Sequence, residues 1–147
     1  MQPDEFSLYD LTVRVERIDG NCTCAMAVGD CFYVQGGKLS LPPGKDFCLY
    51  ALASTLPLLP ARQRHNHPAD WMESDSRVAC PDPACGLVMR IARTAERTLR
   101  HDDVSATPWV DENGGCYTDQ YASIIKNSRP IAEPGVVLAC LSLHREG

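Results

Sequence analysis

The first third of the chain shows the alternation of apolar and polar residues that is typical of antiparallel strands. Between Leu11 and Val15 every second residue is apolar, and this two-residue period predicts a strand with one buried face. A second strand is predicted over residues 28–34. The glycine pair Gly36–Gly37 that comes next can take the positive φ values of a tight hairpin, which would lead into a third strand over Lys38–Leu41.

The next apolar segment has the pattern of a helix. Asp46 is placed to cap a helix that begins at Phe47, because its carboxylate can accept the free amide protons of the first turn. Apolar residues occur on almost every side of this helix as far as Leu59, which predicts a central helix that is covered on most sides. Pro57 must end or kink the helix.

A polar loop and two further strands are predicted after this helix. Residues 61–76 are rich in charged side chains and predict a solvated loop. Val78–Cys80 and Leu87–Ala92 predict strands that a proline-containing turn joins, the second with one apolar face. Residues 94–107 are polar, which is typical of a short surface helix or a connector.

The C-terminal part of the chain predicts one more helix and one more strand. Thr118 is a candidate cap for the helix, and Val136–Leu143 predicts a final strand. The order of elements favours an α+β fold, a mostly antiparallel sheet packed on one central apolar helix with the C-terminal helix and strand added. We expect a single domain over residues 1–147, in which residues 94–147 pack on the core because so short a segment buries too little apolar surface to fold alone.

Composition and charge exclude two classes of partner. The 147 residues are 44% hydrophobic and 22% charged, as in an ordinary globular domain. The net charge of −5 leaves no extended basic surface, so we expect no nucleic-acid partner. We expect no membrane partner either, since the longest apolar stretch, Leu49–Leu59, is about half of the roughly 20 residues that a spanning helix needs.

Eight cysteines are the unusual feature of the composition, and the compartment decides their redox state. Met1–Asp10 carries acidic residues but neither the basic nor the apolar region of a signal or transit peptide. This predicts a cytoplasmic protein whose thiols are reduced. The even number of cysteines also fits four disulfides in a mature secreted chain, which is the alternative.

Cys80 and Cys85 form the most specific local motif. Four residues, two of them proline, separate these cysteines, which places both thiolates within reach of one ion on a stiffened loop. Cys22 and Cys24 are a candidate second pair, and Cys48 could replace one of its members. The five residues predict a site for zinc or iron, or for an iron–sulfur centre. The alternative is a proline-rich turn flanked by unrelated cysteines.

Cys48 has a second interpretation as a catalytic nucleophile. In the first turn of a helix capped by Asp46, the macrodipole and the free amide groups would stabilise a thiolate. Nucleophilic catalysis also needs a base, which the fold would have to bring to Cys48. The chain has four histidines that could serve: His65, His67, His101 and His144. Otherwise Cys48 is one more small apolar residue of a buried helix.

Several short motifs occur along the chain in a characteristic order. The segment at Cys22 is followed by Val-Gly-Asp at 28–30, Phe-Cys-Leu-Tyr-Ala-Leu at 47–52, Leu-Pro-Leu-Leu-Pro at 56–60 and Cys-Pro-Asp-Pro at 80–83. Over about residues 8–93 the chain resembles a family of small uncharacterised cysteine-containing proteins that is common in anaerobic bacteria and archaea. The resemblance implies one core domain in an anaerobic, reducing setting and no particular activity.

The family comparison also concerns individual positions. The resemblance implies that the cysteines at Cys22, Cys48 and Cys80 are the ones usually kept. Met26 stands in the region where the family often has a histidine, which argues against a histidine-dependent site.

The residues support two functions from different classes. The first is a cysteine-ligated metal or iron–sulfur protein of a reducing cytoplasm, which could be a small redox or metal-dependent enzyme. The alternative is a metal-free protein, either a binding module for a small-molecule ligand or an enzyme that uses Cys48 as its thiolate nucleophile. The sequence indicates neither a substrate nor an oligomeric state.

Overall fold

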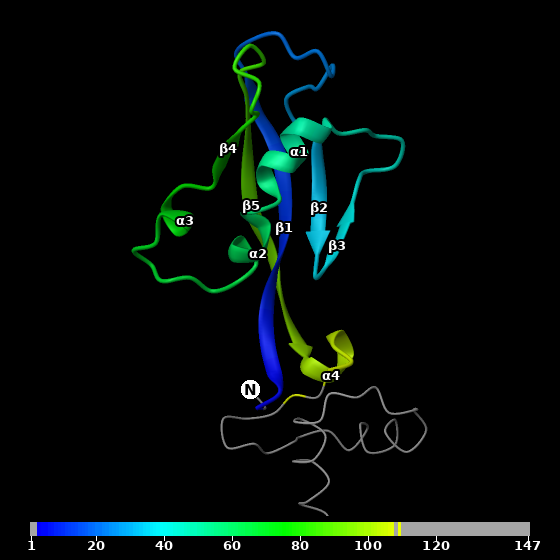
Figure 1. Cartoon of the computed structure of the whole chain (residues 1–147), viewed down its shortest axis with the longest axis vertical. Helices are drawn as coiled ribbons and strands as arrows, with labels where there is room; N and C mark the ends of the chain where they lie inside the picture. Colours follow the sequence, from blue (N-terminus) through cyan, green and yellow to red (C-terminus); the bar gives the residue numbers. More distant parts are fainter. Residues whose placement is uncertain (1–2, 108, 110–147) are drawn as a thin grey trace, which may run out of the picture. The chain divides into compact units, whose positions relative to one another are not determined.

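A five-stranded antiparallel sheet organises the chain, of which this computed structural model describes residues 3–107 and 109 (Figure 1). The strands are β1 (Glu5–Ile18), β2 (Cys31–Gln35), β3 (Lys38–Ser40), β4 (Arg77–Ala79) and β5 (Leu87–Arg100). They lie in the order β3-β2-β1-β5-β4, so the long strands β1 and β5 are neighbours at the centre. The predicted α+β class with an antiparallel sheet is confirmed.

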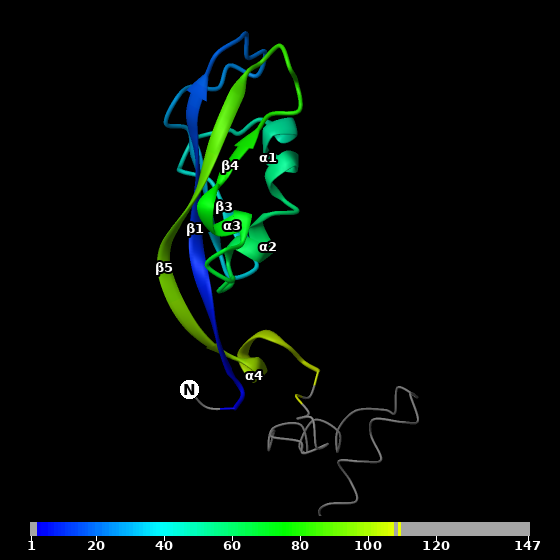
Figure 2. The same cartoon turned by 90° about the vertical axis from the view of Figure 1, so that its left-hand side faces the viewer.

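Short helices connect or follow the strands in the described part of the chain. In residues 3–107 the helices are α1 (Leu49–Thr55), α2 (Leu59–Arg62), α3 (Trp71–Ser74) and α4 (His101–Val104). Figure 2 shows α1, α2 and α3 on the same side of the sheet. No helix in the described part of the chain is long and apolar enough to cross a membrane.

The chain divides into two compact units. Ser7–Thr98 forms the first, and Met1–Phe6 together with Leu99–Gly147 forms the second. In the second unit, a side-chain nitrogen of Arg100 lies 2.7 Å from a carboxylate oxygen of Asp4. The sheet core and the six described cysteines belong to the first unit.

The C-terminal elements that the sequence predicts lie outside the described residues. These elements are the helix after Thr118 and the strand over Val136–Leu143. The single domain over residues 1–147, with residues 94–147 packed on a core of residues 8–93, therefore stays a prediction.

The register of the sheet reflects the apolar alternation of the sequence. In β1, Leu11, Val13 and Val15 are buried, whereas the residues between them face away from the helices. Leu11 pairs with Val34 of β2, and Gln35 pairs with Lys38 across the predicted Gly36–Gly37 turn. Gly36 has a φ of +58°, as the tight turn requires. The three strands predicted for this part are confirmed, although β1 extends further at both ends and β2 begins three residues later.

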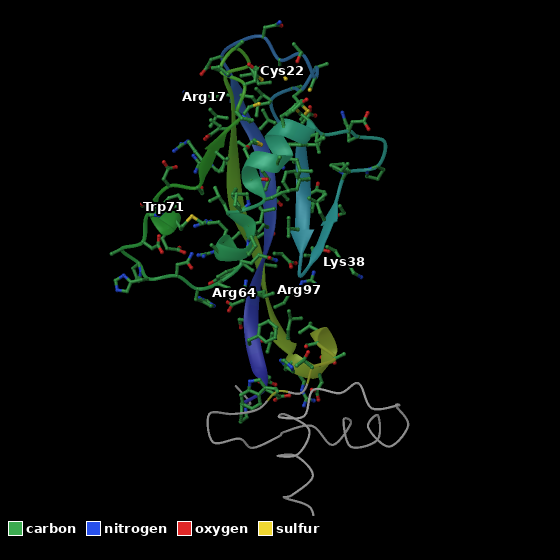
Figure 3. The ribbon with its side chains drawn as sticks, viewed as in Figure 1. Arg17, Cys22, Lys38, Arg64, Trp71 and Arg97 are labelled. Atoms are coloured by element: carbon green, nitrogen blue, oxygen red, sulfur yellow. The ribbon has the colours of Figure 1, made fainter. Side chains whose placement is uncertain are left out.

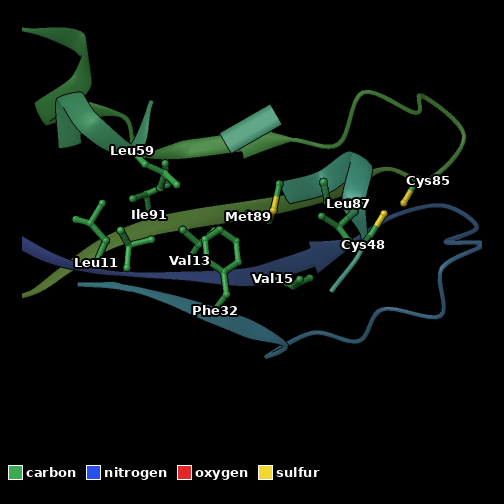
Figure 4. Packing of buried hydrophobic residues seen from close by; sticks show 12 residues of the cluster. Leu11, Val13, Val15, Phe32, Cys48, Leu59, Cys85, Leu87, Met89 and Ile91 are labelled. Carbon is green, nitrogen blue, oxygen red and sulfur yellow. The ribbon is translucent and has the colours of Figure 1, made fainter. Parts of the chain in front are cut away.

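The hydrophobic core lies between the sheet and α1 with α2 (Figure 4). Its buried residues are Leu11, Val13, Val15, Phe32, Val34, Cys48, Ala51, Leu59, Cys85, Leu87, Met89 and Ile91. Phe32 is fully buried, and its ring meets that of Phe47 edge to face at 5.0 Å between centroids. Two of the cysteines, Cys48 and Cys85, thus belong to the same core as the strand residues.

The prediction for the central helix was wrong in two respects. Helix α1 begins at Leu49 with Cys48 at the N-cap position, so Asp46 does not cap it. The helix also is not covered on most sides, because Leu49 is 71% exposed and Tyr50 is 67% exposed. Most of the helix stays exposed because it is short and packs on the sheet with one face, which buries only Ala51 and Thr55. It ends ahead of Pro57, as expected.

The prediction of a solvated loop over residues 61–76 was also wrong in part. Helix α3 lies within this segment, where the Asp70 carboxylate accepts a hydrogen bond from the amide of Met72 at 2.9 Å. Arg62, at the end of α2, is buried, and its guanidinium donates to the carbonyl oxygen of Met72. The Met72 carbonyl and the Glu73 carboxylate, 3.9 Å away, offset part of the cost of burying Arg62, whose Nε has no hydrogen-bond partner in the described residues.

Arg93 of β5 joins this segment to the sheet. Its guanidinium donates to both carboxylate oxygens of Glu73, at 2.7 and 2.6 Å, and to the carbonyl oxygens of Arg62 and Arg64. It also lies 4.4 Å from the centroid of the Tyr9 ring on β1. A single arginine thereby fixes the α2–α3 segment against two central strands.

Strand β5 continues through residues that the sequence assigned to a surface helix or connector. The strand runs to Arg100, and only His101–Val104 is helical. Its polar side chains have partners on β1, since Arg97 is ion-paired with the buried Asp10 at 2.7 Å and the Thr94 hydroxyl donates to the Asp10 carbonyl. Pairing with β1 outweighs the weak local preference of a polar sequence.

Candidate functional site

Five of the six described cysteines gather at one end of the sheet. We call Cys22, Cys24, Cys48, Cys80 and Cys85 the thiol cluster. They come from three segments: the loop after β1, the N-cap of α1 and the loop between β4 and β5. Figure 3 shows Cys22 at this end, and Figure 4 shows Cys48 and Cys85 together at the corresponding end of the core. All five are free thiols.

Backbone hydrogen bonds beyond the ends of β1 and β5 hold two of these segments together. The amides of Asp19, Gly20 and Asn21 donate to the carbonyl oxygens of Gly86, Cys85 and Ala84 at 3.2, 3.1 and 2.9 Å. Any side chain at Gly20 would overlap the Ala84 carbonyl oxygen. Gly20 therefore permits the close approach that places Cys22 beside Cys85.

The loop that carries Cys80 and Cys85 is itself a defined turn. The Cys80 amide donates to the Leu87 carbonyl at 2.8 Å, and the Cys85 amide donates to the Asp82 carbonyl at 3.1 Å. The Asp82 carboxylate accepts a bond from the amide of Ala84 at 2.9 Å. Together with Pro81 and Pro83, these hydrogen bonds hold Cys80 and Cys85 at the two ends of one turn.

The loop after β1 turns back toward α1. The Ala25 amide donates to the Cys22 carbonyl at 3.1 Å, and Ala25 has a φ of +53°, which is uncommon for a residue with a side chain. Further on, the Asp30 carboxylate accepts from the Ala27 amide at 2.8 Å. The tight turn directs Cys24 to Cys48 while leaving Cys24 exposed.

The thiols of the cluster interact in two pairs. Cys24 is paired with Cys48, and Cys22 is paired with Cys85. Electrostatic interactions also join Cys22 to Cys24 and Cys80 to Cys85. Every member of the cluster therefore interacts with at least one other.

The surroundings shift the thiol pKa values in different directions. Burial, with the hydrogen bond to Cys22, raises the pKa of Cys85 to about 11, and the hydrogen bond to Cys48 raises the pKa of Cys24. Burial also opposes ionisation of Cys48, and so does the Asp82 carboxylate. The Ala51 amide, the Cys24 thiol and the Tyr50 amide outweigh both and lower the pKa of Cys48, although its sulfur makes no cap hydrogen bond of ordinary geometry.

Stability at alkaline pH should report the burial of Cys85. Because its pKa is raised above the ordinary value of 9.0, the folded chain keeps this thiol protonated where the unfolded chain ionises it. The resulting stability is fully present below pH 9 and is lost as the pH rises toward 11. We expect the urea midpoint of the reduced, metal-free protein to fall over this range, and Cys85→Ala to fall less steeply. Equal slopes for the two proteins would contradict this.

The thiol cluster is not a preformed metal site. In residues 3–107 and 109, no three side chains of His, Cys, Asp or Glu are grouped so that they could hold a metal ion. The thiols face one another in pairs instead.

The histidines that the sequence offered as bases for Cys48 have other partners. His65 lies 2.8 Å from a Glu96 carboxylate oxygen and 3.1 Å from the Tyr9 hydroxyl. His67 accepts a hydrogen bond from the Ala69 amide. Neither is hydrogen-bonded to Cys48 in the described part of the chain. His101 belongs to the second compact unit, and His144 lies outside the described residues.

Cys31 is the described cysteine that does not belong to the cluster. It is buried and pairs with Arg14, on the face of the sheet turned away from the helices. Its sulfur donates to the Tyr33 hydroxyl at 3.7 Å. Cys31 is therefore a buried thiol outside the cluster, and its substitution can serve as a control for substitutions of the five cluster cysteines.

A hollow of about 270 Å³ opens on the face of the sheet that α1, α2 and α3 do not cover. Its lining residues are Thr12, Arg14, Glu16, Arg90 and Ala92. Arg90 and Arg77 both lie 2.7 Å from the single Glu16 carboxylate, which offsets only part of their charge. The small-molecule ligand that the sequence suggested is not tested by this hollow and stays a prediction.

Sequence reasoning missed what assembles the site. Gly20 carries no chemistry, and its role depends on the carbonyl oxygen of Ala84, which is distant in the sequence. Asp82 is given no role by the sequence pattern beyond its place in the Cys-Pro-Asp-Pro motif, yet its charge acts on Cys48. The position of this aspartate, two residues after Cys80, is the sequence signal that could have indicated a charge close to the thiols.

Comparison with known proteins adds no assignment, since no family model, curated protein or solved structure matches this chain. The resemblance to an uncharacterised anaerobe family stays a prediction, as does the anaerobic, reducing setting. Any assignment of function therefore rests on the geometry of the thiol cluster.

Proposed function

We propose that the protein binds a thiophilic metal, zinc or iron, through the thiol cluster in a reducing cytoplasm. The observation that carries this proposal is the gathering of five thiols from three separate segments, with Cys24 paired to Cys48 and Cys22 paired to Cys85. Packing alone does not account for the cluster, because Cys24 is exposed and so gains little from burial.

The chemistry of binding depends on the pairs. Zinc and iron bind the thiolate, with zinc–sulfur distances of about 2.3 Å. When two paired thiols lose their protons, a cation takes the place of the protons between the sulfurs. The backbone bonds between Asn21 and Ala84 keep Cys22 and Cys85 on facing segments throughout. Binding requires the thiol side chains to rearrange toward one ion, since no three of them are grouped to hold one in the described residues.

The number of thiols favours thiolate-only ligation. Structural zinc sites take four ligands from cysteine and histidine, and iron–sulfur centres commonly take four cysteines; the cluster has five thiols, enough for a site of four cysteines. We expect Cys48 among the ligands, because it is held at the N-cap of α1 between the two loops. The fifth thiol of the cluster would then lie next to the metal site without binding the metal.

Metal content after anaerobic purification tests this proposal, with Cys48→Ala as the variant. We expect the wild-type chain to contain zinc or iron, and Cys48→Ala to lose most of it because one ligand is gone. Cys31→Ala is the matched control, since it removes an equally buried thiol outside the cluster and should keep the metal. An iron–sulfur centre would absorb visible light. Equal metal content in Cys48→Ala and Cys31→Ala would contradict the site.

The alternative function, a metal-free protein with Cys48 as a thiolate nucleophile, is favoured by the lowered pKa of this residue. It predicts that alkylation of Cys48 at neutral pH is fast and does not change when a chelator is added. A metal ligand would instead be protected until the metal is removed. Alkylation rates measured with and without chelator therefore separate the two functions.

A further inference from the structure

The two interacting thiol pairs differ in their access to solvent. Cys24 is exposed on its loop, whereas its partner Cys48 is only 7% exposed. In the other pair, Cys85 is 3% exposed and Cys22 is partly buried. A dissolved reagent can therefore reach a sulfur of the first pair without any opening of the core.

We propose that Cys24 and Cys48 form a dithiol that undergoes thiol–disulfide exchange with small disulfides. Cys24 would react with the external disulfide, and Cys48 would resolve the product. The inference goes beyond metal binding, because the exchange needs the two thiols of the metal-free chain and no metal.

The exchange takes place in two steps. The Cys24 thiolate attacks one sulfur of the external disulfide, whose S–S bond breaks and releases one thiolate. The Cys48 thiolate then attacks the sulfur of Cys24, breaks the mixed disulfide and releases the second thiolate. The protons of Cys24 and Cys48 end on the two released thiols. Two protein thiols are oxidised to one disulfide, and one external disulfide is reduced to two thiols.

The interaction between the two thiols supports the second step, since the resolving thiol, which is 7% exposed at the N-cap of α1, lies near the exposed cysteine whose sulfur it attacks. Cys24 lies in an irregular loop next to the strained Ala25, and Cys48 precedes the first turn of α1 rather than lying within a strand. Neither position is constrained by strand pairing, and the disulfide requires the two α-carbons to come within about 7 Å of each other.

The same reaction would act on a bound metal. Oxidation of Cys24 and Cys48 removes two of the five thiols of the cluster, and fewer than four then remain for a thiolate-only site. Zinc release would accompany the exchange wherever zinc is bound.

The test treats the reduced, metal-free full-length chain with oxidised glutathione and maps the products after alkylation of the remaining thiols. We expect the wild-type chain to form a Cys24–Cys48 disulfide. Cys48→Ser should accumulate glutathione attached to Cys24, because the second step is blocked. Cys24→Ser should leave Cys48 unmodified, since Cys48 is buried. Cys31→Ser is the control and should form the same disulfide as the wild type.

Two results would overturn the inference. One is a wild-type chain that keeps glutathione on Cys24 without forming the disulfide, and the other is a disulfide that joins Cys24 to a different cysteine. Circular dichroism of each variant shows whether it is folded, and the Cys48→Ser adduct reports on Cys24 even if Cys24→Ser fails to fold. A zinc titration of the same preparation is scored separately, so a chain that exchanges disulfides without binding zinc refutes only the metal proposal.

Discussion

Replacing Gly20 with alanine is expected to lower the free energy of unfolding by about 3 kcal/mol, the upper end of the usual cost of overpacking. The new methyl group would overlap the Ala84 carbonyl oxygen and would lie 2.9 Å from that of Cys85. Both obstacles are backbone atoms, so no side chain can rotate away to make room. The two loops that carry Cys22 and Cys85 would have to separate, and metal binding should weaken as well.

The matched control for this substitution is Gly37→Ala. A side chain at Gly37 meets no atom within 4 Å, and like Gly20 it needs no left-handed backbone. Urea unfolding of the two variants should give a large difference at Gly20 and a change within about 0.5 kcal/mol at Gly37. Comparable midpoints for both would show that the two loops do not approach each other so closely.

Phe32→Ala is expected to cost about 4 kcal/mol, which is typical of removing a buried aromatic side chain from a core. Phe32 of β2 is fully buried in the core between the sheet and the helices, and the loss includes its edge-to-face contact with Phe47. The cavity would open below α1, whose N-cap is Cys48. The free energy of unfolding by urea denaturation is the measurement.

Tyr33→Ala provides the comparison for Phe32. Tyr33 is the next residue of β2, faces the other side of the sheet and is partly exposed. We expect it to cost about 1 kcal/mol or less, because surface substitutions change stability little. If Tyr33→Ala destabilised the protein as much as Phe32→Ala, the assignment of the two sheet faces would be wrong.

The sheet was the part of the fold that could be predicted from the sequence. The alternation from Leu11 to Val15 reflects burial of one face, which is a local property of a strand. The length of β5 could not be predicted, because its polar end depends on partners on β1 such as Asp10 for Arg97. The start of α1 was misplaced since Asp46 had the better capping side chain, yet Cys48 occupies that position.

The candidate site also has a part that local sequence predicts and a part that depends on tertiary contacts. The spacing of Cys80 and Cys85 indicated a loop with two thiols, because a short proline-containing turn constrains its own ends. The pairing of Cys22 with Cys85 and of Cys24 with Cys48 depends on tertiary contacts, above all on the approach of Gly20 to Ala84. No spacing along the chain contains that information.

Titration of the reduced, metal-free chain with cobalt(II) under anaerobic conditions tests the central claim most directly. Cobalt can take the place of zinc at a thiolate site, and thiolate ligands give it an intense charge-transfer absorption. We expect this absorption to rise until a single equivalent is bound in the wild-type chain and in Cys31→Ala, and to be largely lost in Cys48→Ala. A folded wild-type chain that develops no thiolate-to-cobalt absorption would contradict the proposal that the thiol cluster binds metal.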